Sequence, residues 1–406
     1  MMYFKEYEIL KRLETSFLKQ FWKFKKRDIF SKIPWHHSWI ILWWERWVGK
    51  TTLLIQKRVE TTDAFYFSAD NVLISNIWLF RFVYFLYEEK RIRNLFIDEI
   101  FKYPNWIQEL KNILDSFPDL KLYCSGSSAL ELYSWIADLG RRIIDIEIKG
   151  FSFREFLNFK YWYNFDSLSF DEILNNHLNL ASEILPQIEG FFSKWLEYIK
   201  KWIYPFGVDL EDEIFFTKLE NTLQRIILQD LPAIKNFDSL TIKHLEKLFY
   251  FIANIPPSEL TISSLASKIW INKVTLSNVL SLLNKIWVIF LVPKYWNVSD
   301  ILRKSYKILF SNSNKYYVYN IEPNVWTIRE CLFLFFVSFI KKAEVFCGKW
   351  NDYYLKFFEN TLNFEIWGES KKRKKRKYWK WVYLVLDIDI SNDKSIIPLW
   401  LLGFLW

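Results

Sequence analysis

The stretch that decides the fold is Trp44-Glu45-Arg46-Trp47-Val48-Gly49-Lys50-Thr51-Thr52. It follows the pattern G-x-x-x-x-G-K-[ST] of a phosphate-binding loop, whose backbone N–H groups close around the phosphates of a nucleotide. The stretch departs from the pattern once, because Trp44 stands where the first glycine is required. Glycine is used there because the loop visits positive φ and touches the ligand, and an indole would fill the space of a phosphate. We expect all nine residues to line the nucleotide site.

The composition offers an explanation for the misplaced tryptophan. Ordinary usage of about 7% glycine would give roughly 28 glycines in a chain of this length, whereas the 406 residues include 9 glycines and 22 tryptophans. We therefore hypothesise that the gene uses a genetic code in which UGA encodes glycine, and that the sequence was translated with a code in which UGA encodes tryptophan. The alternative is an aromatic-rich chain with a degenerate loop.

Other tryptophans also stand where local structure favours glycine. Trp270 falls in the turn between two helical patterns, and Trp287 follows the second of them, at the position where a left-handed residue often ends a helix. Trp202 lies between a helical pattern and a proline, which is again a helix-stop context. Trp106 and Trp400, in contrast, lie in contexts where a large apolar anchor is expected.

Composition and charge limit the class of protein. With 51% hydrophobic and 25% charged residues the chain is globular, and its net charge of +9 permits an anionic partner without requiring one. The three cysteines and four histidines show no metal-ligand spacing, and the odd cysteine count argues against a disulfide framework. No secretory signal and no apolar tract of about 20 residues is present. We expect a cytoplasmic protein that does not enter a membrane.

The order of patterns along the chain predicts an α/β fold. Short β-rich runs alternate with helical segments after residue 39, which favours β-α units around a parallel sheet. The five expected strands are 39–43, 64–68, 94–97, 120–124 and 143–148. The expected domains are an N-terminal helical segment that docks on the core (1–35), a P-loop ATPase core (36–150), a helical lid (151–238), a winged-helix-like module (239–298) and a mixed α/β C-terminal domain (299–406).

Four residues carry the expected chemistry of the core. Lys50 would reach the β and γ phosphates, and the Thr51 hydroxyl would ligate Mg²⁺. The apolar run 94–97 leads into Asp98 and Glu99, as in a Walker B element in which Asp98 holds the Mg²⁺ shell and Glu99 polarises the attacking water. Taken alone, that run would be read as an ordinary strand entering an acidic loop. Its distance from the phosphate loop favours the catalytic interpretation.

Two further candidates leave alternatives open. The run 124–128 ends a strand, and one of its hydroxyls could sense the nucleotide, whereas Ser128 could equally cap a helix together with Glu131. Arg141 lies on a loop before the last sheet strand, where it could act as an arginine finger or form a structural salt bridge.

Several motifs together resemble the AAA-superfamily ATPases, of the archaeal and bacterial type, that carry a C-terminal domain of unknown function. The segments that carry the resemblance are 67–71, 96–100, 102–106, 125–128, 140–141, 152–156, 324–330, 364–368 and 397–400. The resemblance implies ATP binding and regulated hydrolysis, with roles for Lys50, Thr51, Asp98 and Glu99. In that family the places of Trp44, Trp326 and Trp367 are typically glycine.

The C-terminal part of such proteins is similar to restriction-endonuclease-like folds, in which acidic residues and a nearby lysine support metal-dependent cleavage. Asp352 and Glu365 are the matching carboxylates here, but Glu365-Ile366-Trp367 lacks the lysine. The basic run 371–380 could bind DNA phosphates or be a solvated charged face, and the helical pattern 272–286 is the candidate recognition helix of the winged-helix-like module.

The sequence thus favours an ATPase that uses ATP and Mg²⁺ to move its attached modules, and it could act as an oligomer. One alternative is a DNA-binding or interaction protein that does not use nucleotide and carries a degenerate loop. A further alternative is an ATP-gated nuclease.

Overall fold

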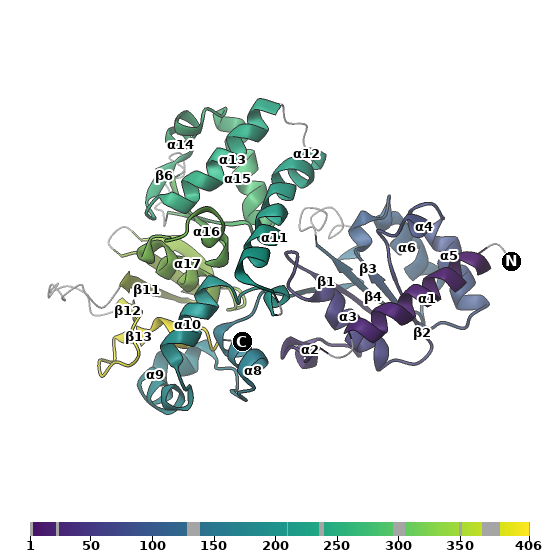
Figure 1. The fold of residues 1–406 in the computed structure, drawn as a ribbon, viewed down its shortest axis with the longest axis horizontal. Coiled ribbons are helices and arrows are strands. Elements are labelled where there is room, and N and C mark those ends of the chain that lie inside the picture. The colour runs from purple at the N-terminus through teal and green to yellow at the C-terminus, as the bar shows by residue number, and fades with distance from the viewer. Residues whose placement is uncertain are drawn as a thin grey trace. The chain divides into compact units, whose positions relative to one another are not determined.

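The structure is a computed structural model that describes residues 3–21, 24–127, 139–208, 210–234, 239–294, 305–348, 351–367 and 382–405. The chain forms two compact units, Met1–Gly150 and Phe151–Trp406 (Figure 1). In the described part of the chain, no helix combines the length and apolar character needed to cross a bilayer.

The first unit is built on a parallel sheet of five strands in the order β2-β3-β4-β1-β5. The strands are β1 (Trp39–Trp43), β2 (Ala64–Ser68), β3 (Asn94–Asp98), β4 (Lys121–Gly126) and β5 (Ile144–Glu147). The central strands are apolar and buried along most of their length, as in a sheet covered on both faces. The expected α/β class and the parallel sheet are confirmed.

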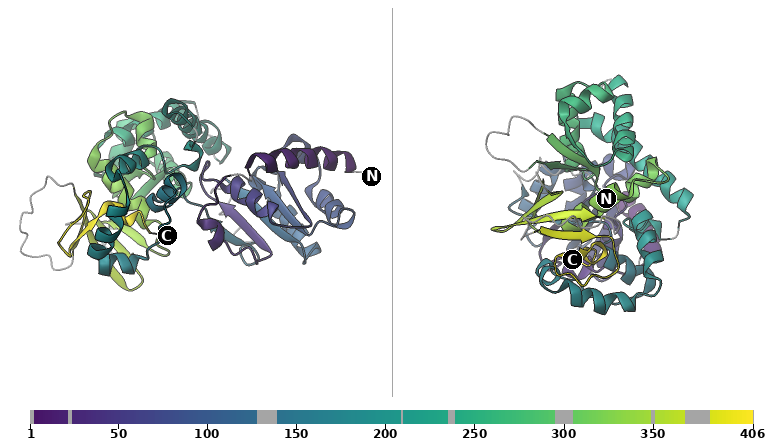
Figure 2. Two further views of the ribbon diagram at one scale, coloured as in Figure 1. Left: turned by 60° about the horizontal axis from the view of Figure 1, so that its bottom comes forward. Right: turned by 90° about the vertical axis from the view of Figure 1, so that its left-hand side faces the viewer.

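Helices cover this sheet and its outer edge. They are α1 (Phe4–Phe21), α2 (Ile29–Lys32), α3 (Lys50–Val59), α4 (Val72–Ser75), α5 (Leu79–Glu88), the 3₁₀ turn η1 (Ile100–Lys102) and α6 (Trp106–Ser116). Figure 2 shows α1, in purple, lying along the sheet. The buried carboxylate of Glu14 on α1 accepts hydrogen bonds from Arg58 Nε (2.7 Å) and from the backbone N–H of Tyr66 on the edge strand β2 (2.8 Å). This contact satisfies an N–H that would otherwise be exposed at the sheet edge.

The second unit begins with a series of helices. They are α8 (Phe153–Tyr161), α9 (Phe170–Ile184), η2 (Leu185–Gln187), α10 (Phe191–Lys200), η3 (Pro205–Gly207), α11 (Asp212–Arg225), the π-helical turn η4 (Ile226–Asp230) and α12 (Leu231–Ile234). The Phe153 ring lies 6.2 Å from the ring of Phe404, and Arg154 N donates to Gly403 O at 3.0 Å. The helices expected as a lid therefore share one core with the C-terminal end of the chain.

A three-stranded antiparallel sheet with the order β6-β8-β7 follows, together with three helices. The elements are α13 (Ser239–Asn254), β6 (Glu259–Thr261), α14 (Ile262–Ile269), α15 (Lys273–Lys285), β7 (Ile289–Pro293) and β8 (Ser305–Phe310). On α15 the buried residues are Leu276, Val279, Leu280 and Leu283, which is the spacing of a helix with one apolar face. The third strand, β8, lies beyond residue 298, where we expected this module to end.

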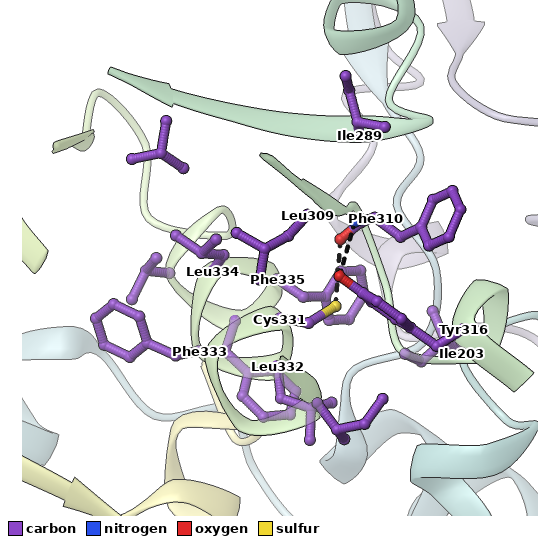
Figure 3. Close-up of a cluster of buried hydrophobic side chains, with 14 of the residues drawn as sticks. Ile203, Ile289, Leu309, Phe310, Tyr316, Cys331, Leu332, Phe333, Leu334 and Phe335 are labelled. Carbon is purple, nitrogen blue, oxygen red and sulfur yellow. Dashed lines mark hydrogen bonds between the residues drawn. The ribbon is translucent and has the colours of Figure 1, made fainter. Parts of the chain in front are cut away.

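The C-terminal elements form a mixed sheet in the order β13-β12-β11-β10-β9. They are α16 (Asn314–Tyr319), α17 (Val325–Val337), β9 (Glu344–Cys347), β10 (Tyr353–Phe357), β11 (Asn360–Trp367), β12 (Val382–Leu386), β13 (Ile396–Pro398) and α18 (Leu399–Leu402). Figure 3 shows α17 beside β8: Cys331 Sγ donates to Phe310 O (3.3 Å), and Phe310 N donates to the Tyr316 hydroxyl (3.0 Å). The Phe333 ring of α17 lies 5.4 Å from the ring of Tyr353 on β10, so this helix also packs against the C-terminal sheet.

Four tryptophans have the left-handed backbone that favours glycine. The φ angles are 69° at Trp47, 62° at Trp162, 60° at Trp270 and 59° at Trp287. These four are among the ten described residues other than glycine that have positive φ, although an indole gives no local hydrogen bond that would favour this conformation. Trp270 and Trp287 are two of the positions where the sequence indicated a helix stop.

The other tryptophans of interest do not have positive φ. The helix α10 ends at Lys200, so the helix stop expected near Trp202 is confirmed. Trp202 nevertheless lacks the left-handed backbone; it is buried, and its Nε1 donates to Glu197 Oε1 at 2.6 Å. Trp326 lies in the first turn of α17 and Trp367 ends β11. Trp106 and Trp400 are buried anchors, as expected.

Trp270 provides a direct measure of this backbone strain. Because its side chain is 79% exposed, Trp270→Gly removes little buried area while relieving a left-handed conformation. We expect a gain of about 1 kcal/mol in the free energy of unfolding, measured by urea denaturation. Trp400→Gly, at a site with 1% exposure, should instead lose roughly 3–5 kcal/mol. A loss of stability in Trp270→Gly would contradict the argument.

Candidate functional site

The phosphate-loop stretch joins the end of β1 to the start of α3. Gly49 precedes the helix with φ 92°, and Lys50 is its first residue. This strand-loop-helix order presents the free N–H groups of a helix N-terminus, which favour anions. Trp44 is buried, with its ring 5.5 Å from the ring of Trp43 and 5.3 Å from Lys149 Nζ. The left-handed residues of the loop are Trp47 and Gly49, not Trp44, where we had expected positive φ.

The Lys50 ammonium lies inside the loop. Its Nζ donates to Trp44 O at 3.0 Å and to Glu45 O at 2.6 Å. Burial lowers the pKa of Lys50 to about 8, and this fall is partly offset by the nearby carboxylates of Glu99 and Asp98. The loop thus holds a buried ammonium group whose charge is destabilised by burial, and an incoming anion would stabilise that charge.

Asp98, at the end of β3, accepts hydrogen bonds from three hydroxyls. Thr51 Oγ1 donates to its Oδ2 at 2.8 Å and the Tyr66 hydroxyl donates to the same oxygen at 3.0 Å, while the Ser125 hydroxyl donates to Oδ1. Burial raises the pKa of Asp98. Hydroxyl and carboxylate oxygens are hard ligands of the kind that Mg²⁺ prefers, so Thr51 and Asp98 fit this ion.

Thr51 and Asp98 alone would leave several of the coordination positions of Mg²⁺ without a protein ligand. Within the described ranges, no group of three or more His, Cys, Asp or Glu side chains could hold a metal ion. A magnesium ion at Thr51 and Asp98 would therefore take its other ligands from water and phosphate oxygens, which is its usual habit.

Glu99 follows Asp98 with a left-handed backbone, at φ 50°. Its Oε2 accepts from Ser127 Oγ at 2.7 Å, and its N–H faces Ser125 Oγ at 3.3 Å. In the sheet, β4 lies between β3, which ends in the carboxylates, and β1, which leads into the phosphate loop. Gly126 leaves room for the Phe101 ring, which a Cβ would overlap.

Not every predicted residue joins this site. Arg141 is exposed on the turn before β5, and the neighbouring Arg142 pairs with Asp115. Ser128 and Glu131, and with them the choice between a sensor and a helix cap, lie outside the described residues. The same is true of the basic run 371–380.

Asp352 belongs to a cluster of charged side chains that also includes Lys307 and Glu330. The Asp352 carboxylate accepts from Ile366 N at 2.8 Å and lies 3.7 Å from Lys307 Nζ, which also pairs with Glu330 at 2.9 Å. Glu365 lies on β11, the middle strand of the sheet, and is half-buried. The lysine near Asp352 is Lys307 of β8, which no pattern in the sequence indicated.

Sequence reasoning also missed two residues of the first unit, Tyr66 and Arg27. Tyr66 donates to Asp98, and the buried Arg27 contacts the phosphate loop through Val48 O. Ser125, which also donates to Asp98, lies at the end of β4, within the run 124–128 that was considered as a nucleotide sensor. No pattern distinguishes Tyr66 or Arg27 from other residues of their type.

Comparisons with known proteins support an AAA-type core. Residues 37–157 match the model of a family described as an AAA domain. An uncharacterized protein of Methanocaldococcus jannaschii is 33% identical over 290 residues, which cover 67% of this chain and 60% of that protein. The fold of the first unit and the family match together make this part of the chain similar to AAA-type P-loop domains, a class of nucleotide-binding domain.

Similar solved structures include AMPPCP-bound DnaA from Aquifex aeolicus, at 15% identity, with 68% of this chain and 88% of that chain covered and a TM-score of 0.25. Another is PCH-2 of C. elegans, at 14% identity, with 60% and 61% covered and a TM-score of 0.22. At such TM-scores the superpositions support no further argument.

Proposed function

We propose that this protein binds ATP with Mg²⁺ at the phosphate loop and hydrolyses it. The observation that carries the proposal is the Thr51 Oγ1 to Asp98 Oδ2 hydrogen bond of 2.8 Å, directly beside Lys50 at the start of α3. It brings the candidate phosphate-binding and metal-binding groups, which are 47 residues apart in the sequence, into one site. The proposed consequence of hydrolysis is a conformational change in the modules of the second unit.

Each side chain has a proposed task. Lys50 would exchange the carbonyls of Trp44 and Glu45 for the β and γ phosphates. Thr51 and Asp98 would hold Mg²⁺, and the ion would supply positive charge beside the phosphates. Glu99 orients the attacking water and accepts its proton. Arg141, exposed on its turn, is the proposed arginine finger for a neighbouring copy of the chain.

We further propose that Trp44 and Trp47 are glycines in the functional protein. The left-handed backbone of Trp47, Trp162, Trp270 and Trp287 supports this proposal, because glycine adopts that conformation without strain. The position of Trp44 supports it as well, because Trp44 is the first residue of the loop, where the pattern has glycine, and its side chain is buried. The cause would be the reading of UGA codons as tryptophan.

DNA is the proposed partner of the second unit, in the cytoplasm. The three helices and antiparallel sheet of 239–310 support a winged-helix-like module, and Lys273 and Lys285 are exposed on its helix α15. The rival interpretation is that the protein does not use nucleotide and that DNA binding by this unit is its function.

The test of ATP binding uses the pKa of Lys50. The protonated amine pairs with phosphate, so affinity should be constant below a pKa of about 8 and fall as the free site loses its proton above it. In the full chain carrying Trp44→Gly and Trp47→Gly, we expect the Kd for ATP to rise about tenfold between pH 7 and pH 9, by titration calorimetry.

Two variants make this test specific. Lys50→Ala should weaken ATP binding at pH 7 by about 100-fold and remove the pH dependence. Lys57→Ala, on the same helix but paired with Glu60 near its end, should change neither. DNA binding by a chain that binds no ATP in any of these forms would favour the rival function.

A further inference from the structure

Arg27 connects two parts of the first unit, the phosphate loop and the segment that follows β5. It lies just before α2 and is buried, with 6% exposure. Its Nη1 donates to Val48 O at 2.7 Å and to Lys149 O at 2.8 Å, and its Nη2 donates to Gly150 O at 3.4 Å. One planar guanidinium therefore holds the phosphate loop and the segment that follows β5.

The contact with Val48 determines the direction of a loop N–H. Val48 C=O and Gly49 N–H belong to one planar trans peptide, so they point to opposite sides of the chain. When Arg27 holds the carbonyl, the Gly49 N–H is aimed away from Arg27, next to the start of α3. The Cα of Gly49 lies over the arginine, since a Cβ there would be 3.8 Å from Arg27 Cδ.

The contacts with Lys149 and Gly150 lie where the chain leaves the first unit. The pairing of β5 with β1 ends at Glu147, and Ile148 N donates to Trp43 O at 2.9 Å. Gly150 is the last residue of the first unit and Phe151 is the first of the second. We call residues 148–150 the exit segment. A substitution of Arg27 therefore removes hydrogen bonds both from the phosphate loop and from the exit segment.

We propose that Arg27 is a positioning residue that couples nucleotide binding at the loop to the conformation of the exit segment; this inference rests on the proposed ATP site. Nucleotide that binds the Gly49 N–H favours the peptide orientation that Arg27 also favours. By linkage, an ordered exit segment favours nucleotide binding to the same extent. Lysine cannot replace this function, because its single ammonium does not match the spread of three carbonyls.

The experiment measures both ends of the coupling in the full chain carrying Trp44→Gly and Trp47→Gly. Amide hydrogen exchange is followed over 45–50 and 146–152, with and without ATP, together with the Kd for ATP. In this background ATP should slow exchange in both segments. Arg27→Lys should weaken ATP binding about tenfold, remove the ATP effect at 146–152, and raise ligand-free exchange in both segments together.

Controls separate coupling from a general structural role. Arg93→Lys changes a guanidinium of the same unit that donates to Tyr87 O (2.8 Å) and Ile92 O (3.1 Å), and it should leave both segments unchanged. Arg27→Gln keeps hydrogen-bond donors without charge, and it serves if Arg27→Lys does not fold. If Arg27→Lys weakens ATP binding but ATP still slows exchange at 146–152, the proposed coupling is wrong, while the proposed ATP site stands.

A background chain that binds no ATP would refute the proposed function. The ligand-free measurement still decides the inference in that case. If Arg27→Lys raises exchange at 45–50 but not at 146–152, Arg27 does not link the two segments.

Discussion

Restoring glycine at positions 44 and 47 is expected to raise the affinity of the chain for ATP by at least about 100-fold, which corresponds to roughly 2.7 kcal/mol. Trp47→Gly relieves a left-handed backbone at φ 69°, and Trp44→Gly removes a buried indole from the base of the loop. Titration calorimetry with Mg²⁺ and ATP measures the difference in Kd between the chain with Trp44 and Trp47 and the double variant.

A matched control is Trp162→Gly, which removes another tryptophan with positive φ that is 76% exposed in the second unit. It should leave ATP affinity unchanged. Peptide mass spectrometry of the natural protein across 40–50 provides an independent check, with glycine masses expected at both positions. Tryptophan masses, together with no gain in the double variant, would show that the loop is degenerate.

The second large effect is expected for Glu99→Gln. This change keeps the size of the side chain and a contact with Ser127, but it removes the carboxylate that we assign to proton transfer from water. In the chain with both loop glycines, ATP hydrolysis should fall by about 10²–10⁴-fold, while the Kd for ATP changes less than threefold. Phosphate release under saturating ATP measures the rate.

Glu60→Gln is the control for this prediction, because Glu60 is a surface carboxylate of the same unit that pairs with Lys26 and Lys57. Its hydrolysis rate should match that of the parent. A Glu99→Gln chain that hydrolyses ATP at the parent rate would place the catalytic base elsewhere.

Local patterns were sufficient for the strand-loop-helix element. The run 39–43 is apolar, the stretch after it carries the phosphate-loop pattern, and the expected strand coincides with β1. The run 94–97 likewise predicted β3, which extends one residue further to Asp98. These features are readable because strand burial and the requirements of a phosphate loop act over fewer than ten neighbouring residues.

Helices end close to Trp202, Trp270 and Trp287, as the sequence indicated, but the backbone conformation at these three positions was only partly readable. Trp270 and Trp287 have the left-handed backbone that their contexts indicated, whereas Trp202, in a similar context, is a buried core residue bonded to Glu197. Local sequence specifies where a helix tends to end. Whether an indole at that place is strained or packed depends on what the rest of the chain brings against it.

The α/β class, the phosphate-loop pattern and the two carboxylates that follow the apolar run 94–97 can be read from the amino-acid sequence. The bonds of Tyr66 and Ser125 to Asp98, the ion pair of Lys307 with Asp352, and the link from Val48 through Arg27 to Gly150 emerge in the folded chain. The partners in these contacts lie far apart along the chain. A hydrogen bond between residues 27 and 150 leaves no periodicity or motif in the sequence, because it depends on how the whole sheet is assembled.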